Sequence, residues 1–156
     1  MTISLTGRSK NIGMFGVAIT TSSISVGSRC PHACAGVGAV ATQNITDPHL
    51  ATLVLNQMED GYSAQEAINR VTTNQNFINY RQLTAIDHNG TTAHFTGTHI
   101  LGTHAIHEAV DCVAAGNLLS SSTIPKAMTA GFNLNPETHL AERLILGLEA
   151  GIAAEG

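Results

Sequence analysis

The stretch Met1-Thr2-Ile3-Ser4-Leu5-Thr6 decides the fold that we expect, because polar and apolar residues alternate along it from the start. Alternation with a period of two is typical of a β-strand that buries one face. Removal of Met1 would leave Thr2 at the head of this strand, with a free α-amine beside its own hydroxyl. An α-amine, whose unperturbed pKa is about 8, can take the hydroxyl proton and so activate threonine as a nucleophile. Many ordinary proteins also begin Met-Thr, so a plain strand start is the alternative interpretation.

The residues that follow predict an antiparallel hairpin and a third strand. Strands over residues 2–6 and 14–20 flank residues 7–13, which contain the Gly, Ser and Asn residues typical of a turn. Small residues occupy nearly every position of a third expected strand over residues 36–43, which indicates that another layer or a substrate approaches its backbone closely. Further strands are expected over residues 80–87, 91–96 and 112–115, the first two joined by a turn that contains Asn89-Gly90.

Capping residues predict three helices. Asp47-Pro48 provides an N-cap and a first helical residue, and Gly61 is expected to end this helix. Ser63-Ala64-Gln65-Glu66 is a capping box for the second helix. Asn135-Pro136 is expected to begin the third, in which Leu140, Leu144 and Leu148 recur before Gly151 ends it. The order of strand pairs, a helical pair, further strands and closing helices favours an α+β fold, an α-β-β-α sandwich with the N-terminal strand inside.

Composition excludes several classes of protein. A chain of 156 residues is expected to form one domain that buries about two-thirds of its unfolded surface. The formal net charge is −4 and only 7 residues are Lys or Arg, so no basic surface for nucleic acid is expected. No apolar run is long enough to span a bilayer, and the polar start lacks the hydrophobic region of a signal peptide. We therefore expect a cytoplasmic protein that does not bind membranes, with Cys30, Cys34 and Cys112 as thiols.

Blocks of residues spread along the chain resemble the domain-of-unknown-function 1028 (DUF1028) family. Each block alone is weak, and the combination is specific. The blocks are residues 1–4, 15–19, 35–43, 81–83, 95–97, 115–119 and 140–144.

The resemblance implies the fold of the N-terminal-nucleophile (Ntn) amidohydrolases, a four-layer α-β-β-α sandwich, with Thr2 at the position of the nucleophile. Two departures affect the pocket: Ala115 stands where relatives often have glutamine, and residues 102–105 replace an aromatic-rich stretch. Relatives also continue with further strands after the closing helix. We therefore expect a homo-oligomer, or a hetero-oligomer in which a second chain supplies C-terminal strands.

Six further residues are candidates for the site. Gly116 and Asn117 could donate a backbone N–H and a side-chain amide to a developing oxyanion, and a simple turn is the alternative. Thr42, Gln43 and Asn44 leave the small-residue strand together and could bind a substrate amide or carboxylate, or merely satisfy strand-end backbone groups. Arg29 could clamp a carboxylate or could be an ordinary surface arginine.

The histidines do not form a recognised metal motif. His94, His99, His104 and His107 lie near Glu108, Asp111 and Cys112, but their spacing matches neither the His-Glu-x-x-His helix nor a paired-cysteine zinc site. Cys30 and Cys34 have no second cysteine pair, so reduced thiols explain them as well as a zinc site or a Cys-His nucleophile does. We expect no metal and no cofactor.

These observations together predict an amidohydrolase that cleaves a small amide or peptide-like C–N bond through Thr2. The alternative is a non-catalytic ligand-binding or assembly subunit, which would keep the sandwich and use the cleft at Thr42 to Asn44. The mass of the N-terminus distinguishes the two, because a retained Met1 in active protein would rule out a free Thr2 amine.

Overall fold

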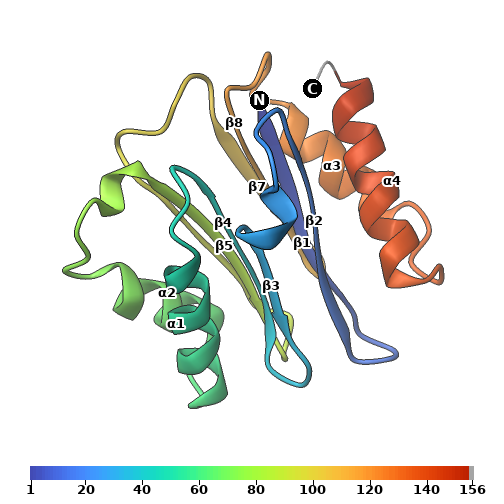
Figure 1. Ribbon diagram of the computed structural model, residues 1–156. Coiled ribbons are helices and arrows are strands. Elements are labelled where there is room, and N and C mark those ends of the chain that lie inside the picture. Colours follow the sequence, from blue (N-terminus) through green and yellow to red (C-terminus); the bar gives the residue numbers. More distant parts are fainter. Residues whose placement is uncertain (155–156) are drawn as a thin grey trace.

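The computed structural model describes residues 1–154 as a mixed α+β fold with two antiparallel four-stranded sheets (Figure 1). The first sheet has the strand order β2-β1-β8-β7, and the second has the order β3-β4-β5-β6. The strands of the first sheet are β1 (Thr2–Ser9), β2 (Met14–Thr21), β7 (Ala105–Ala109) and β8 (Cys112–Asn117). Those of the second are β3 (Pro31–Cys34), β4 (Gly38–Asn44), β5 (Arg81–Asp87) and β6 (Thr92–Thr96).

Four α-helices cover the outer faces of the sheets within the described residues. Helices α1 (Pro48–Glu59) and α2 (Ala64–Thr72) pack on the second sheet, whereas α3 (Ile124–Asn133) and α4 (Leu140–Ala153) pack on the first (Figure 1). Two short 3-10 helices, η1 (Val26–Ser28) and η2 (Ile78–Tyr80), lie in the connections. None of the helices in residues 1–154 combines the length and apolar character that a bilayer-spanning segment requires.

The alternation of β1 gives its two faces different environments. Ile3 and Leu5 are fully buried in the core between the first sheet and helices α3 and α4. Because successive side chains of a strand point to opposite faces, Thr2, Ser4 and Thr6 face the second sheet. The hydroxyls of Thr6 and Thr84 are 3.0 Å apart and join the two sheets. The polar positions of β1 therefore lie in the layer between the sheets.

Four predictions of local structure are confirmed. The Asp47 carboxylate accepts a hydrogen bond from the His49 N–H at 3.2 Å, as an N-cap of α1 does. At α2, the Glu66 N–H donates to the Ser63 hydroxyl and the Ser63 N–H donates to the Glu66 carboxylate, at 3.3 and 2.9 Å. The hydrogen bonds from Ser63 lower the pKa of Glu66. The hairpin of β1 and β2 and the pair of β5 and β6 also have the expected antiparallel pairing.

The expected third helix is wrong at both ends. Helix α4 begins at Leu140, where the His139 imidazole accepts a hydrogen bond from the Ala141 N–H, so Pro136 lies in the preceding loop. Gly151 does not end the helix but lies inside it, where a Cβ would stand 2.6 Å from Met128 Cγ of α3. This glycine thus permits close helix packing rather than a left-handed cap. The sequence analysis also missed α3, β3 and β7.

Candidate active site

Thr2 lies at the head of β1 between two neighbouring strands. It stands opposite Thr21 of β2 and opposite Asn117 of β8 in the sheet register. The hydroxyls of Thr2 and Thr21 are 2.9 Å apart, and both side chains are partly buried. The Thr2 hydroxyl therefore has a hydrogen-bond partner that can fix its rotamer on the face of the sheet that carries polar side chains.

Arg29 is connected to this threonine through a chain of hydroxyls. The Thr21 and Ser23 hydroxyls are 3.5 Å apart, and the Arg29 guanidinium donates to the Ser23 hydroxyl at 2.6 Å. A second guanidinium nitrogen donates to the carbonyl of Ile24 in the same loop. Arg29 pairs with no carboxylate among residues 1–154. Its visible role is to hold the loop after β2, and a contact with a substrate carboxylate remains a prediction.

Two glutamines face each other across the second sheet. Gln43 of β4 and Gln82 of β5 are register partners, and the Gln43 amide donates to the Gln82 carbonyl oxygen at 2.7 Å. They are 2% and 0% exposed, and this single bond leaves the Gln43 oxygen and the Gln82 nitrogen without partners. An amide pair joined by one hydrogen bond always leaves one carbonyl oxygen and one NH₂ group, whichever way each amide is flipped.

The first sheet contributes two more unpaired polar atoms. The Ser4 hydroxyl and the Asn117 amide nitrogen are buried and have no hydrogen-bond partner. Buried polar groups without partners are rare, because each forfeits its bonds to water. Ser4, Asn117, Gln43 and Gln82 thus each carry an unsatisfied polar atom; we call these four residues, with Thr2, the polar layer.

The direction of the strands brings the two halves of this polar layer to the same end of the molecule. Thr6 meets Thr84, and the Arg8 guanidinium donates to the carbonyl of His88, so β1 and β5 face each other and run in the same direction. Gln82 lies two residues before Thr84, as Ser4 lies two residues before Thr6. Val40 and Leu83 face the core under α1 and α2. Gln43 and Gln82 are an odd number of positions from them on the same strands, so their side chains point the other way, into the layer between the sheets.

Gly116 and Asn117 occupy different surroundings. Gly116 pairs with Ile3 of β1 and with Ala105 of β7, so it lies inside the sheet, and a Cβ there would stand 2.6 Å from Leu119 Cδ2. Asn117 is the last residue of β8 and is 2% exposed. Of the two predicted oxyanion donors, the Asn117 amide is the one with an unused N–H in the polar layer. The role of Gly116 stays a prediction.

Thr42 and Asn44 have partners that are structural. The Thr42 hydroxyl donates to the carbonyl of Asp47 at 3.4 Å, beside the start of α1. Asn44 has a φ of 73° and bonds the Tyr80 carbonyl at 2.6 Å, while its side-chain oxygen accepts from the Leu101 N–H at 3.1 Å. These contacts match the alternative interpretation, in which the residues satisfy strand-end backbone groups. Gln43 alone of the three belongs to the polar layer.

The histidines are dispersed by the fold. His94 Nδ1 lies 3.1 Å from the Glu108 carboxylate, and His107 Nδ1 lies 2.8 Å from the Thr129 hydroxyl. Residues 1–154 contain no group of three or more metal-ligating side chains close enough to share an ion. Cys30, Cys34 and Cys112 are free thiols. Burial raises the pKa of Cys112 to about 12, so this thiol is protonated at neutral pH and is a poor nucleophile.

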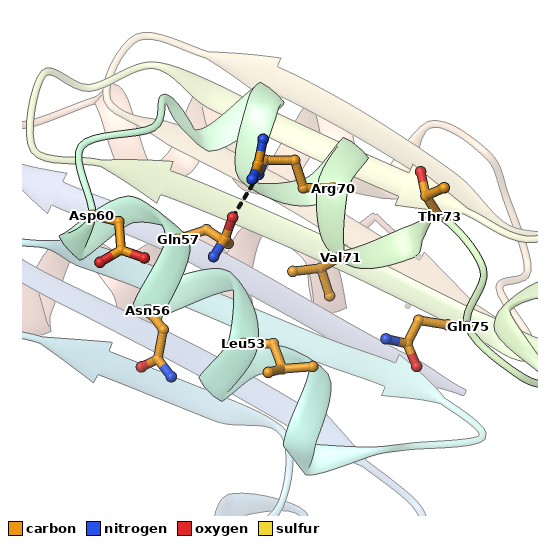
Figure 2. Close-up of a pocket in the computed structure, with 8 residues that line it drawn as sticks. All are labelled: Leu53, Asn56, Gln57, Asp60, Arg70, Val71, Thr73 and Gln75. Carbon is orange, nitrogen blue, oxygen red and sulfur yellow. Dashed lines mark hydrogen bonds between the residues drawn. The ribbon is translucent and has the colours of Figure 1, made fainter.

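A hollow on another part of the described chain contains none of these residues (Figure 2). It has a volume of about 700 Å³ and lies between α1 and α2, on the helix side of the second sheet. Arg70 Nε donates to the Gln57 side-chain oxygen there at 2.6 Å. None of the predicted site residues lines it. The Thr73 hydroxyl in its lining donates to the Asn69 carbonyl at 2.7 Å, and the Asp60 carboxylate lies at the opposite end of the hollow (Figure 2), so we place the candidate site at the polar layer instead.

Sequence reasoning missed Ser4, Thr21 and Gln82. Ser4 was detectable, because it follows Thr2 with the period of two that puts both on one face of β1. Thr21 was adjacent to the expected end of the second strand, but its pairing with Thr2 depends on the exact hairpin register. Gln82 lay within a block of residues that resembled a known family, without any local feature that linked it to Gln43.

Comparisons with known proteins identify the family and support the overall fold. A family model described as a family of unknown function, DUF1028, matches residues 2–156. A crystal structure of protein SPO2555 from Silicibacter pomeroyi, itself described as DUF1028, is 28% identical and superposes with a TM-score of 0.92. The similarity covers 98% of this chain and 70% of that one. The search of curated proteins found no match.

Proposed function

This chain belongs to the DUF1028 family, and from that membership together with the position of Thr2 we propose that it is an amidohydrolase of the Ntn type. The observation that carries the proposal is that Thr2 heads an inner strand, faces the second sheet and is bonded to Thr21 beside Asn117. Two facing sheets with a helix pair outside each would be the four-layer α-β-β-α sandwich of that superfamily. Fold alone does not determine chemistry, so the proposal rests on the residues of the polar layer.

The proposed reaction begins with removal of Met1. The freed α-amine of Thr2 accepts the hydroxyl proton, directly or through a water, while Oγ1 forms a bond to the carbonyl carbon of the substrate. The Asn117 amide donates to the oxyanion that develops on the carbonyl oxygen. The C–N bond then breaks, the leaving amine takes the proton, and an ester on Thr2 remains. Water cleaves that ester, which releases the acid and restores the hydroxyl.

The unpaired atoms of the glutamine pair fit an amide substrate. The Gln43 oxygen needs a donor and the Gln82 nitrogen needs an acceptor, and a carboxamide group offers both. The Gln43 oxygen and the Gln82 nitrogen are buried in this structure. A substrate would therefore reach them only if the polar layer opened to solvent at the end where Thr2 lies. We therefore assign the pair to recognition of a small amide rather than to bond cleavage.

One observation favours a second function, that of a non-catalytic binding or assembly subunit. Met1 is partly buried and packs against the core beneath α3 and α4, and while Met1 is attached the Thr2 nitrogen is a peptide amide. A protein that keeps Met1 has no free amine to serve as the base. In that case the polar layer would bind a ligand without cleaving it.

Labelling with a β-lactone tests the catalytic proposal. Intact mass of protein from its native source first shows whether Met1 has been removed. A β-lactone probe should then acylate Thr2, and the mass should rise by that of the whole probe, because ring opening loses no atoms. Peptide mapping should place the adduct on the N-terminal peptide.

Two variants make the labelling decisive. Thr2→Ala should take no label, whereas Thr20→Ala should label normally, because Thr20 pairs with Ile3 and lies on the opposite face of the sheet. Processed wild-type protein that stays unlabelled, or a label that persists in Thr2→Ala, would overturn the catalytic role. Retention of Met1 in protein that turns over amides would move the chemistry to another residue.

A further inference from the structure

A small cavity lies at the other end of β1 from Thr2. It has a volume of about 180 Å³ and is formed where the β1–β2 turn, the β7–β8 turn and the segment between α3 and α4 meet. Its lining includes Lys10, Asn11, Asp111, Asn133, Glu137 and Arg143. None of these residues takes part in the proposed cleavage of amides, so this cavity is independent of that proposal.

Arg143 is the unusual member of this lining because its charge is buried. The residue is 4% exposed, and its guanidinium carbon lies 4.0 Å from the centre of the Phe132 ring. Nε donates to the Phe132 carbonyl at 3.2 Å, and Nη2 donates to the Asn133 side-chain oxygen at 3.4 Å. Within the described part of the chain, the third guanidinium nitrogen of Arg143, Nη1, forms no hydrogen bond to another residue.

The missing feature is a counter-ion. Among residues 1–154, no carboxylate lies within ion-pair distance of Arg143. Taking a guanidinium out of water is costly unless an anion compensates it. The carbonyl of Phe132, at the C-terminal end of α3, supplies only a partial negative charge. A full negative charge in the cavity would complete the compensation.

The other charges around the cavity leave it positive. Asp111 is already neutralised, since its carboxylate lies 2.5 Å from Arg8 Nε. Lys10 is exposed in the β1–β2 turn and lines the cavity from the other side. Glu137 is exposed and forms no ion pair with Lys10 or Arg143. Two uncompensated cations therefore face one solvated carboxylate.

We propose that this cavity binds a small oxyanion, the carboxylate or phosphate group of a small molecule. The free Nη1 of Arg143 and the ammonium of Lys10 are its two charged donors, and the guanidinium offers the planar geometry that such groups prefer. The structural role of Arg143 toward Phe132 uses Nε and leaves Nη1 for the ligand.

Titration of the full chain followed by NMR tests the site. Inorganic phosphate and acetate are added separately to ¹⁵N-labelled protein, with sodium chloride at the same ionic strength as the reference. We expect saturable shifts of the backbone signals of Asn11, Asp111 and Asn133 with at least one of the two oxyanions. A response to phosphate alone identifies phosphate groups as the ligand chemistry, and a response to acetate identifies carboxylates.

Variants of the two lysines provide a matched pair. Lys10→Ala should weaken the binding by about two- to fivefold, as loss of one exposed charge does. Lys126→Ala should leave it unchanged, because Lys126 is an exposed lysine of α3 that does not line the cavity. Arg143→Gln should weaken binding by more than about tenfold.

Three results would overturn the proposal. In the first, sodium chloride shifts the NMR signals as much as either oxyanion does. In the second, Lys10→Ala and Lys126→Ala bind the oxyanion with equal affinity. In the third, folded Arg143→Gln binds the oxyanion as tightly as the wild type does. If Arg143→Gln does not fold, the comparison of the two lysine variants still decides.

Discussion

At the scale of single residues, Thr2 is distinguished from Thr6, the other threonine of β1, by its exposure. Each has a hydroxyl as its partner, Thr84 for Thr6 and Thr21 for Thr2, but Thr6 is fully buried between the sheets whereas Thr2 is partly exposed. A hydroxyl pair leaves donor and acceptor capacity on both oxygens. Thr2 can therefore keep its rotamer and still exchange a proton with an amine or a water.

This leads to the first prediction. Thr2→Ala should abolish amide turnover, because it removes the attacking oxygen, and Thr2→Ser should keep part of the rate. Since Thr2 is partly exposed and outside both cores, the urea midpoint should change little. Release of amine from a panel of small amides measures the rate. Turnover by purified Thr2→Ala at the wild-type rate would exclude this nucleophile, once contaminating enzyme has been ruled out.

Asn117 gives a prediction that separates catalysis from folding. Asn117→Ala should lower the catalytic rate by about a hundredfold or more if the amide stabilises the oxyanion. Stability should fall much less than loss of a bonded amide would cause, because the amide nitrogen is already unpaired. Rate assays and urea unfolding on the same protein give both values. Parallel losses of rate and stability would instead indicate that Asn117 has a structural role at the end of β8.

Cys112 gives a prediction about pH. Its pKa is raised to about 12 in the folded protein by burial, above the ordinary value of 9.0. Above pH 9 the unfolded chain therefore ionises this thiol while the folded chain keeps it protonated, so the free energy of unfolding should decrease with rising pH up to about 12.

Removal of this thiol should flatten the alkaline loss. Cys112→Ala should be less stable than wild type at neutral pH but should lose less further stability on the alkaline side. Urea unfolding across that range provides the measurement. An identical alkaline slope in both proteins would show that Cys112 does not cause the dependence.

At the scale of elements, glycines set how closely α4 approaches the first sheet. A Cβ at Gly147 would stand 2.3 Å from Leu5 Cδ2 and 3.0 Å from the Met128 carbonyl oxygen. Leu5 is fully buried and the carbonyl belongs to the α3 backbone, so neither neighbour can move freely. The helix, the inner strand β1 and α3 are thus mutually constrained at this one position.

Gly147→Ala should destabilise the protein by about 1–3 kcal/mol, the usual cost of overpacking, despite a gain in helix propensity of up to about 1 kcal/mol. Urea unfolding measures the change. Gly27→Ala is the control, because no atom lies within 4 Å of the position that its Cβ would take, and we expect almost no change. A stabilised Gly147→Ala would mean that α4 lies farther from β1 than described.

The elements also show what a sequence can predict. The caps at Asp47 and Ser63 act through residues at most three positions away. The sequence therefore predicts α1 and α2 together with the residues at which they begin. The start of α4 depends on His139, which is not a typical N-cap residue, while Asn135-Pro136 offered a stronger local pattern. Strands β3 and β7 have 4 and 5 residues; β6 is as short as β7 but follows the Asn89-Gly90 turn, whereas neither β3 nor β7 follows an Asn-Gly turn.

The residues of the candidate site also separate into those that local sequence predicts and those that it does not. Thr2, Gln43 and Asn117 were predicted from strand ends and from a resemblance, and each lies in the polar layer. Gln82 could not be predicted, since its role depends on pairing with Gln43 from 39 positions away and on which faces of the two sheets meet. Such contacts depend on the tertiary arrangement, and local periodicity does not encode it.

At the scale of the whole molecule, the arrangement tolerates large sequence change. A structure that is only 28% identical superposes with a TM-score of 0.92, so the two sheets and their helices are retained while most side chains differ. The chain spans 70% of that relative. The outer strands are β2 and β7 in the first sheet and β3 and β6 in the second, and each presents an edge that another strand could extend.

The last prediction concerns a partner. Ile145 and Ile152 are 52% and 53% exposed and lie seven positions apart on α4, so they share one face of that helix. Two exposed isoleucines on this face, which also carries Glu149, favour association with a second copy or with another polypeptide. We expect native mass spectrometry of protein from its native source to show an assembly larger than one chain.

Charge placed on this helix face distinguishes it from other exposed apolar positions. Ile145→Lys combined with Ile152→Lys should shift the assembly toward single chains, because burying two ammonium groups at an interface is costly. Phe77→Lys serves as the control, since Phe77 is 72% exposed in the connection between α2 and β5 of the second sheet, whereas α4 packs on the first sheet. Equal effects of the two changes would place the interface elsewhere. A wild-type chain that is monomeric and active at micromolar concentration, with no co-purifying polypeptide, would show that neither the helix face nor the sheet edges need a partner.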